Sequence, residues 1–313
     1  MSGSDLPRVV LDLAGGDFGY AVNLEALRIL SRESDLPFDI IAVGNPELDE
    51  WNFDFELVNS CDNDPVKVGL ELVRDGVAQA FVSVGDTSKV VSRAAFILGR
   101  VENISRPAII AMFPTIHREP AIVIDVGATP SANAQNLVDF ALMSVVYAEN
   151  VLGWNSPKVA LLSIGEESKK GTPEIREAGA TLTSILPNFI GNAEGRDVIH
   201  RRSDIFVCEG LVGNILLKFF ESMRDFFRVA FHRAKNKDLR SKFGGTLLEP
   251  SIRSILTEFD YATYGGAPLL GVNGVCIIGH GRSTPQAVRN AVHLAAKISS
   301  TGIVEKIKDL STI

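Results

Sequence analysis

The sequence predicts an α/β fold, and three of its features support this prediction. Short apolar runs alternate with longer amphipathic stretches, which is typical of strand, loop and helix repeating through a sheet. Gly, Asp or Pro bounds most of these runs. No internal repeat, low-complexity tract or Pro/Gly-rich linker divides the chain, so we predict a single domain over residues 1–313.

Eight apolar runs have the length and the bounding residues of strands. They are Arg8–Leu13, Asp39–Val43, Ala80–Val84, Ala108–Phe113, Ala121–Asp125, Val159–Ile164, Ile205–Cys208 and Gly274–Gly279. Most of them end in a turn that contains Gly or Asp. Because ligands of open α/β sheets bind beyond the carboxyl ends of strands, we expect several of these turns to converge into one active site.

Composition and charge restrict the class of protein. The chain has 46% hydrophobic and 22% charged residues, so it is globular rather than disordered. Its net charge of −7 argues against general affinity for nucleic acid. Cys61, Cys208 and Cys276 are widely spaced and indicate neither a disulfide framework nor a zinc site. With no secretory signal and no apolar run long enough to span a membrane, we expect a cytosolic protein with reduced thiols.

The segment from Ile215 to Phe259 carries two long helical patterns. Aromatic residues and one Met recur in it at helix-like intervals: Phe219, Phe220, Met223, Phe226, Phe227 and Phe231. We predict a projecting helical hairpin with its turn near 242–250 and its Phe-rich face buried. An ordinary core-facing helix, a dimer interface and a membrane-surface contact are the three open interpretations of that face.

The loop from Ser163 to Pro173 follows a strand and precedes a helix that we expect to begin near Pro173. It places Lys169 and Lys170 beside a helix N-terminus, which is a credible site for an anion. The alternative is a solvated loop in which Thr172 caps the helix. Spacing by itself favours that alternative.

Three further turns are candidate sites. Asn214, after Gly213, is either a helix N-cap or an amide that orients a ligand. Gly15-Gly16-Asp17 lacks the spacing of a dinucleotide-binding fingerprint, so a nicotinamide cofactor is unsupported. His280 follows the last predicted strand in a Gly-rich turn with Arg282 two residues on, and its structural and functional interpretations stay equally open.

Many stretches of the chain occur together in one order that resembles a known family. They are Leu11–Asp17, Phe96–Arg100, Asp125–Ala128, Asn136–Met143, Val146–Glu149, Gly165–Glu167, Phe189–Asn192, Glu194–Asp197, Gly213-Asn214, Tyr264–Gly271 and His280-Gly281. In this order they resemble the bacterial phosphate acyltransferase family of phospholipid synthesis, known as PlsX. The resemblance covers nearly the whole chain, which is identified as a divergent member.

The resemblance implies a three-layer α/β/α sandwich with a mainly parallel sheet, like that of isocitrate and isopropylmalate dehydrogenases. It implies transfer of a fatty acyl group from acyl carrier protein to inorganic phosphate, giving acyl phosphate without any metal or organic cofactor. It also implies a homodimer, loose contact of the 215–259 hairpin with the inner face of the membrane, and a membrane glycerol-3-phosphate acyltransferase as downstream partner.

Site residues carry over by the same resemblance. Lys170 and Asn214 match the residues proposed for catalysis, the lysine neutralising charge and the amide holding phosphate in line with the thioester carbonyl. The expected phosphate- and substrate-binding residues are Gly15, Gly16, Asp17, Gly85, Thr87, Lys89, Asp125, Gly165, Glu166, Gly213 and His280. Because phosphate is itself the nucleophile and a thiol leaves readily, no serine or cysteine nucleophile is expected.

Two departures from the family pattern bear on activity. A basic segment is missing where Asp62–Pro65 runs directly into a helix expected over 66–74. The usual Gly-Asn-Thr-Gly turn is Gly85-Asp86-Thr87-Ser88, and we expect Lys89 to compensate for the added carboxylate. The alternatives are a phosphate acyltransferase that uses coenzyme A thioesters and a silent relative that only binds acyl carrier protein or membrane.

Overall fold

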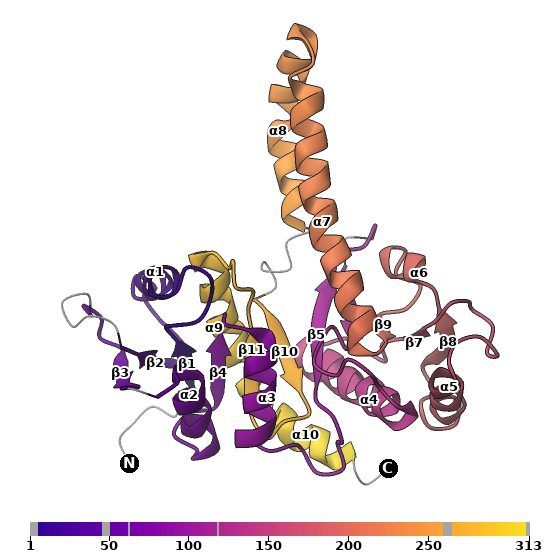
Figure 1. Ribbon diagram of the computed structural model, residues 1–313, viewed down its shortest axis with the longest axis horizontal. Helices are drawn as coiled ribbons and strands as arrows, with labels where there is room; N and C mark the ends of the chain where they lie inside the picture. The colour runs from indigo at the N-terminus through magenta and orange to yellow at the C-terminus, as the bar shows by residue number, and fades with distance from the viewer. Residues whose placement is uncertain (1–5, 46–50, 62, 118, 259–264, 311–313) are drawn as a thin grey trace.

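The computed structural model describes residues 6–45, 51–61, 63–117, 119–258 and 265–310. One mixed, mainly parallel sheet runs through this part of the chain, with helices on both of its faces (Figure 1). The predicted α/β class and the three-layer arrangement are therefore confirmed. The assignment of all 313 residues to one domain stays a prediction, and the continuity of the sheet supports it.

The elements alternate as the sequence pattern indicated. The strands are β1 (Arg8–Asp12), β2 (Asp39–Gly44), β3 (Glu56–Asn59), β4 (Ala80–Ser83), β5 (Ala108–Phe113), β6 (Ala121–Ile124), β7 (Val159–Leu162), β8 (Phe189–Ala193), β9 (Ile205–Val207), β10 (Ala267–Leu270) and β11 (Val275–Ile278). The helices are α1 (Tyr20–Leu30), α2 (Pro65–Arg74), α3 (Thr87–Ile97), α4 (Ala134–Val151), α5 (Pro173–Ile185), α6 (Gly195–Ile199), α7 (Gly210–Lys235), α8 (Leu239–Glu258), α9 (Pro285–Ser299) and α10 (Ile303–Asp309).

The strand order is β3-β2-β1-β4-β11-β10-β5-β6-β9-β7-β8. The five strands from β3 to β11 are mutually parallel, and so are the four from β6 to β8. Between these sets, the β11–β10, β10–β5 and β5–β6 pairs are all antiparallel. Three reversals make the two parallel sets run in opposite directions, so their carboxyl ends point opposite ways along the sheet.

Each face of the sheet has its own hydrophobic core. One core joins the sheet to α1, α4, α5, α9 and α10, with Leu27, Phe140 and Val288 fully buried in it. The other joins the opposite face to α2, α3, α6 and the beginning of α7, around Phe81 and Phe206. Both faces are covered because nearly all central strand residues are apolar, which is typical of parallel sheets.

Three strands fall outside the eight predicted runs. β3 and β8 lie at the two edges of the sheet and are only partly buried, so polar residues and Gly191 interrupt their apolar pattern. β10 is a short central strand that contains Pro268. An unbroken apolar run indicates a strand that is buried on both faces. Strands that are partly exposed or that contain Pro lack such a run and are missed.

The hairpin is present, but its turn was predicted in the wrong place. α7 ends at Lys235 and α8 begins at Leu239, so the turn is 236–238 rather than 242–250 (Figure 1). Gly244 and Gly245 lie inside α8. A Cβ added at Gly245 would stand 2.7 Å from Lys235 Cγ, so this glycine permits close packing of the two helices instead of making a turn.

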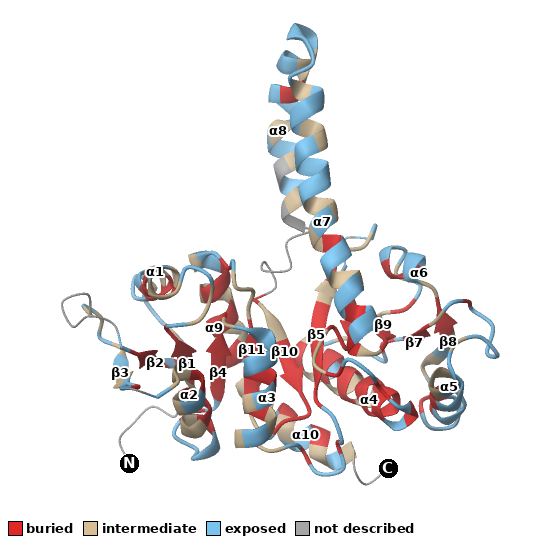
Figure 2. Ribbon diagram, viewed as in Figure 1, coloured by how far each residue is buried: buried red, intermediate tan, exposed pale blue. Residues whose placement is uncertain are grey.

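The prediction of a buried Phe-rich face is also wrong. Phe219, Phe226 and Phe227 are 58%, 62% and 45% exposed, because the hairpin extends beyond the sheet that would cover them (Figure 2). Phe220 is the buried exception near the base, where its ring meets that of Phe113 with centroids 4.9 Å apart. No helix of the described residues is long and apolar enough to cross a membrane.

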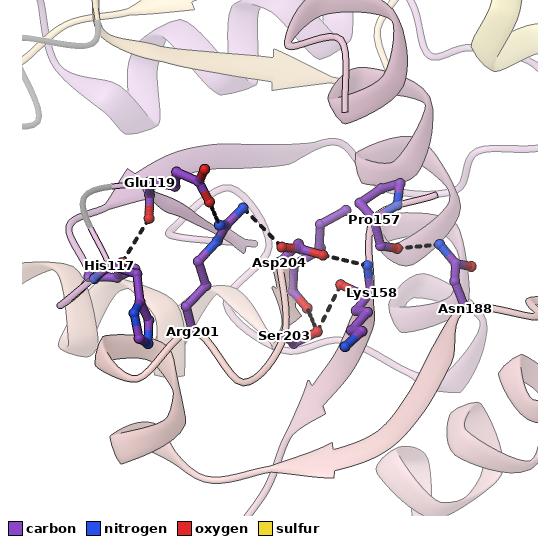
Figure 3. Close-up of polar contacts among 10 residues, drawn as sticks. His117, Glu119, Pro157, Lys158, Asn188, Arg201, Ser203 and Asp204 are labelled. Carbon is purple, nitrogen blue, oxygen red and sulfur yellow. Dashed lines mark hydrogen bonds and ion pairs between the residues drawn. The ribbon is translucent and has the colours of Figure 1, made fainter. Parts of the chain in front are cut away.

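Polar contacts fasten the amino ends of β7 and β9 to each other (Figure 3). Lys158 N donates to Asp204 Oδ2 at 2.8 Å, and Ser203 Oγ donates to the Lys158 carbonyl oxygen at 2.8 Å. Arg201 bridges Asp204, at 3.0 Å, to Glu119. These contacts fix the relative position of the strands whose opposite ends carry Lys170 and Asn214.

Candidate active site

The predicted site residues fall into two groups because the strands that carry them run in opposite directions. The first group follows β1, β4 and β11 and comprises Gly15, Gly16, Asp17, Gly85, Thr87, Lys89 and His280. The second follows β6, β7 and β9 and comprises Asp125, Gly165, Glu166, Lys170, Gly213 and Asn214. Strands β11, β10 and β5 lie between β4 and β6. The turns after the predicted strands therefore lie at opposite edges of the sheet in two groups, and the expectation that several of them build one active site stays a prediction.

The first group is organised around a buried carboxyl group. Asp12 Oδ2 accepts a hydrogen bond from Ser83 Oγ at 2.7 Å, and Oδ1 accepts from Ala14 N at 3.0 Å. Ser83 Oγ in turn accepts from Gly85 N at 3.1 Å. Burial raises the pKa of Asp12, while the hydrogen bonds oppose that rise. A Cβ added at Gly15 would stand 2.8 Å from both Gly85 N and Asp12 Oδ2, so only glycine fits there.

The third turn of the first group packs against the first. Asp17 N donates to the Gly281 carbonyl oxygen at 2.7 Å, which places His280 beside the Gly16-Asp17 turn. His280 Nδ1 accepts from Arg282 N at 3.0 Å, so this nitrogen fixes the shape of its own loop. Asn23 of α1 holds the first turn through the carbonyl oxygens of Leu13, Gly15 and Gly19, a role that sequence reasoning missed.

Lys89 is paired with a carboxylate other than that of Asp86, and its compensating role stays a prediction. Its Nζ lies 3.0 Å from Asp64 Oδ2, and Arg93 contacts the same oxygen at 2.6 Å. Asp86 is also engaged, because its Oδ1 accepts from Lys89 N at 2.8 Å and caps α3, where Thr87 is the first residue. These contacts, with the Ser88 hydroxyl, hold the pKa of Asp86 below its ordinary value. Asp64 and Asp86, which belong to the two segments that depart from the family pattern, thus both have contacts with residues of α3.

The second group is also built on a buried aspartate. Asp125 Oδ1 accepts from the backbone N–H groups of Ile109, Gly127 and Ala128 at 2.8, 3.0 and 3.0 Å, and Oδ2 accepts from Thr129 N at 2.6 Å. Burial raises the pKa of Asp125, and the N–H donors oppose that rise. The side chain therefore shapes the turn after β6, and its expected substrate contact stays a prediction.

Asn214 lies over this turn and is not a helix N-cap. α7 begins at Gly210 with Glu209 as its N-cap, so Asn214 is already inside the helix. A Cβ added at Gly127 would be 3.8 Å from Asn214 Oδ1, which places the amide against the turn. The helix can approach so closely because residue 213 is glycine: a Cβ there would stand 1.9 Å from the Asp125 carbonyl oxygen.

Lys170 is an exposed residue of the loop between β7 and α5. Hydrogen bonds within this loop and from β8 fix the backbone around it. Lys170 N donates to the Glu167 carbonyl oxygen at 2.9 Å, and Asn192 Nδ2 donates to that same oxygen at 2.9 Å. A Cβ on Gly165 would be 3.2 Å from Lys170 Cγ, so the lysine stem packs on this glycine. Thr172 Oγ1 accepts from Ile175 N at 3.4 Å and caps α5 as predicted.

Glu166 is held by two arginines. Its Oε2 lies 2.7 Å from Arg202 Nη1, and its Oε1 lies 3.7 Å from Arg196 Nη2. The pairs fasten the β7–α5 loop to α6 and to the segment after it. The structure therefore places Glu166 in a structural ion pair, and its expected substrate contact stays a prediction.

One cavity of about 1390 Å³ lies beside the Lys170 loop and the beginning of α7, where Asn214 lies. Ser163, Ile164 and Gly171 line it from the first loop, and Val212 and Ile215 line it from α7. Lys170 and Asn214 are not lining residues themselves; each is adjacent in the chain to one that is. Much of the remaining lining is apolar and includes Leu137, Leu162, Ile175, Leu216 and Phe219. Such a cavity suits an apolar chain with a polar end.

Two side chains of the cavity lining were not anticipated. Ser163 Oγ is buried and has no hydrogen-bond partner among the described residues, which is uncommon for a hydroxyl in that position. Cys208 Sγ donates to the Asp125 carbonyl oxygen at 3.5 Å, and burial together with the charges of Asp125 and Glu209 raises its pKa well above the ordinary value. Because the thiolate is the nucleophilic form, Cys208 is a poor nucleophile.

No group of three or more His, Cys, Asp or Glu side chains in the described ranges could hold a metal ion. Sequence spacing could suggest Lys170, but nothing in it marks Asn192 or Ser163. Their roles depend on contacts between β7 and β8, which are separated by a helix in the chain.

Comparison of the sequence with known proteins gives consistent matches. A family described as fatty acid synthesis protein matches residues 55–306. A phosphate acyltransferase from Halothermothrix orenii is 36% identical across 96% of this chain and 97% of its own length. A phosphate acyltransferase from Moorella thermoacetica is 41% identical across 78% of this chain and 72% of its own length.

Solved structures resemble the chain at the level of fold. A branched-chain phosphotransacylase from Enterococcus faecalis superimposes with a TM-score of 0.63 at 16% identity, covering 94% of this chain and 99% of that protein. A 4-hydroxythreonine-4-phosphate dehydrogenase from Klebsiella pneumoniae gives a TM-score of 0.54 at 12% identity, covering 94% and 99%. At these identities the likeness establishes the shared fold alone.

Proposed function

Because the chain belongs to the phosphate acyltransferase family, we propose that it transfers a fatty acyl group from an acyl carrier protein thioester to inorganic phosphate. The products are acyl phosphate, for phospholipid synthesis, and the free carrier thiol. The observation that carries this proposal is one cavity that lies beside both the Lys170 loop and the beginning of α7, where Asn214 lies. Its apolar lining fits an acyl chain, and Lys170 and Asn214 are each adjacent in the chain to a residue that lines it.

The chemistry follows from these groups. A phosphate oxygen attacks the thioester carbonyl carbon, a C–O bond forms, and the tetrahedral intermediate expels the thiolate as the C–S bond breaks. The Lys170 ammonium offsets the charge of phosphate and of the developing oxyanion. The Asn214 amide holds phosphate in line with the carbonyl carbon, which lowers the entropic cost of bringing two reactants together.

Transfer is direct in this scheme, without an acyl-enzyme. Cys208 is the thiol beside the cavity, but burial raises its pKa well above the ordinary value, so it stays protonated at neutral pH. Phosphate is already anionic and needs no general base. Ser163 Oγ can donate to a phosphate oxygen from the cavity wall, because its hydroxyl has no other partner among the described residues.

The remaining predicted contacts are part of the same proposal. We assign Gly165 and Gly213 to the cavity border, where each allows a close approach of the chain. The turns of Gly15, Gly85 and His280 form a second surface for substrate. The exposed hairpin is the proposed site of homodimer and membrane-surface contact, supported by its uncovered apolar side chains. A membrane glycerol-3-phosphate acyltransferase would consume the product.

The proposal is tested by trapping acyl phosphate with hydroxylamine from purified protein, acyl carrier protein thioester and phosphate. Lys170→Ala and Asn214→Ala should each lower kcat by roughly 10²–10³-fold, as expected for removal of one oxyanion donor. Lys169→Ala removes the neighbouring exposed lysine and should leave kcat within about twofold of wild type. A wild-type protein that binds the thioester but yields no acyl phosphate would be a silent relative.

The acyl donor is identified in the same assay. Acyl carrier protein and coenzyme A thioesters are compared at equal concentration of the same acyl chain. A higher kcat/KM with the carrier protein supports the proposal. Efficient saturation by the coenzyme A thioester, with no gain from the carrier protein, identifies the alternative donor.

A further inference from the structure

Two arginines line the same cavity from the loop between α3 and β5. Arg100 and Arg106 both belong to this loop, and both are exposed. The acidic lining residues Glu174 and Glu209 come from α5 and from the segment after β9. The wall formed by the α3–β5 loop therefore carries positive charge.

The backbone around Arg106 is anchored on both sides. Asn136 Nδ2 donates to Ser105 Oγ, which fixes the preceding residue to the first turn of α4. Thr129 Oγ1 donates to the Pro107 carbonyl oxygen at 2.9 Å, which fixes the following residue to the turn after β6. Arg106 itself makes no hydrogen bond or ion pair with the described residues, so its guanidinium is available for a ligand on a fixed support.

The order and direction of the strands place the Arg106 loop and the Lys170 loop at one edge of the sheet. Arg106 precedes β5, whereas Lys170 follows β7, and β6 and β9 lie between these two strands. β5 is antiparallel to β6 and β7 is parallel to it, so the start of β5 and the end of β7 share one edge. Three strand spacings of ~4.8 Å separate the start of β5 from the end of β7 by about 14 Å.

The spacing of these two strand ends is close to the length of the arm that carries a thioester. A pantetheine arm joins its phosphate to its sulfur through a chain of atoms equivalent to about four extended residues, which span ~14 Å. With its thioester near the Lys170 loop, an arm of this length can reach the Arg106 loop across the cavity that both loops border. Guanidinium suits this phosphate because it can donate two parallel hydrogen bonds.

We propose that Arg100 and Arg106 form a subsite for the phosphate of the phosphopantetheine arm of the acyl donor. The inference rests on the proposed function and names a part of the substrate that the reacting centre does not touch. Arg106 supplies the direct contact. Arg100 Nη1 donates to the Ser105 carbonyl oxygen, so it supports the loop and adds positive charge.

Binding of unreactive thioether analogues tests the subsite without requiring turnover. Calorimetry should show that wild type binds S-alkyl phosphopantetheine about tenfold more tightly than S-alkyl pantetheine, and that Arg106→Ala binds both equally. Arg32→Ala removes an exposed arginine at the end of α1 and should keep the wild-type preference. Equal affinities in wild type, or an unchanged preference in Arg106→Ala, would overturn the proposal.

Kinetics separate the two phosphates that could bind there. With acyl-phosphopantetheine as donor, Arg106→Ala should raise the KM for the donor about tenfold and leave the KM for inorganic phosphate unchanged. A rise in the KM for inorganic phosphate alone would show that Arg106 binds the attacking phosphate and would refute the subsite. If the analogues bind as expected but no acyl phosphate forms, the proposed function fails and the subsite stands.

Discussion

At the scale of single residues, we expect a substitution of Ser163 to change activity and stability in different ways. Its Oγ is buried at the cavity with no partner among the described residues, so Ser163→Ala removes an unsatisfied polar group. We expect the free energy of unfolding to stay equal or rise by up to about 1 kcal/mol. If the hydroxyl donates to phosphate, kcat should fall about tenfold, the equivalent of one hydrogen bond.

Urea unfolding and the hydroxylamine assay measure these two effects on one variant. Ser203→Ala serves as the matched control, because that hydroxyl donates to the Lys158 carbonyl oxygen at 2.8 Å, away from the cavity. It should lose stability by about 1 kcal/mol and keep its kcat. Unchanged kcat in Ser163→Ala would exclude a role for this hydroxyl in phosphate binding.

The structural role of a residue was predictable from the sequence only where its own chemistry and its neighbours in the chain determine that role. Thr172 caps α5 as expected, because Thr followed by Pro is a strong local signal. Lys89 is different: its partner Asp64 lies 25 residues earlier, and only the packing of α2 on α3 brings the two together. The same limit applies to Asn192, which holds the Lys170 loop from a neighbouring strand.

At the scale of elements, the beginning of α7 depends on one glycine. A Cβ at residue 213 would stand 1.9 Å from the Asp125 carbonyl oxygen, so Gly213→Ala must push the helix away from the turn after β6. We expect a loss of about 3 kcal/mol in the free energy of unfolding. The kcat should fall as well, because the displacement moves Asn214.

Gly244→Ala is the matched control for this change. Gly244 also lies inside a helix, but a Cβ there meets nothing within 4 Å, so alanine should stabilise α8 by up to about 1 kcal/mol. Thermal unfolding of the two variants therefore shifts in opposite directions. A stabilised Gly213→Ala protein would contradict the close approach of α7 to Asp125.

The contact of the α1 end with α9 gives a prediction for acid. Glu33 accepts from Arg289 Nε at 2.6 Å and lies 2.9 Å from His293 Nε2. The hydrogen bond with Arg289, with the nearby His293, holds the pKa of Glu33 below its ordinary value of 4.5. A lowered pKa in the folded state adds stability above the unfolded pKa, and this stability is lost as the pH falls through the folded value.

Replacing Glu33 with Gln should remove this dependence. At neutral pH we expect Glu33→Gln to be less stable than wild type by about 1 kcal/mol, since charge-assisted hydrogen bonds at a partly exposed site are lost. The difference should shrink as the pH falls below 4.5. Urea unfolding at several pH values measures it, and a difference that grows in acid would show that the sign is wrong.

The sequence predicted elements better than their directions. β5 has the bounds that apolar patterning gave, and the other seven predicted strands differ by at most two residues at an end. Patterning reports burial and carries no information on whether neighbouring strands are parallel. For that reason the reversals at β10 and β5 were not foreseen, and the predicted turns divide into two groups.

At the scale of the whole molecule, the hairpin extends away from the rest of the fold and keeps apolar side chains exposed (Figure 2). The range 242–250, where a turn was expected, belongs to α8, and Gly245 within it lets α8 pack on α7. Two helices that contact each other leave their outer faces uncovered. Exposed aromatic side chains on such faces are typical of surfaces that meet another protein or a membrane.

The last prediction tests this surface. Phe226 and Phe227 lie with ring centroids 5.7 Å apart near the middle of α7, where no strand covers them. Replacing both with Glu should leave thermal stability and acyl phosphate formation without membranes unchanged. Binding to anionic vesicles should fall more than tenfold, because two apolar side chains of roughly 1.5–3 kcal/mol each are replaced by charges that lipid repels.

Vesicle co-sedimentation measures the loss, and light scattering during gel filtration shows whether self-association changes with it. Phe96→Glu is the matched control, since Phe96 is 89% exposed but lies on α3, outside the hairpin. It should bind vesicles and self-associate as wild type does. If the double variant also behaves like wild type in both measurements, the hairpin faces neither membrane nor partner, and its exposed aromatic residues need another explanation.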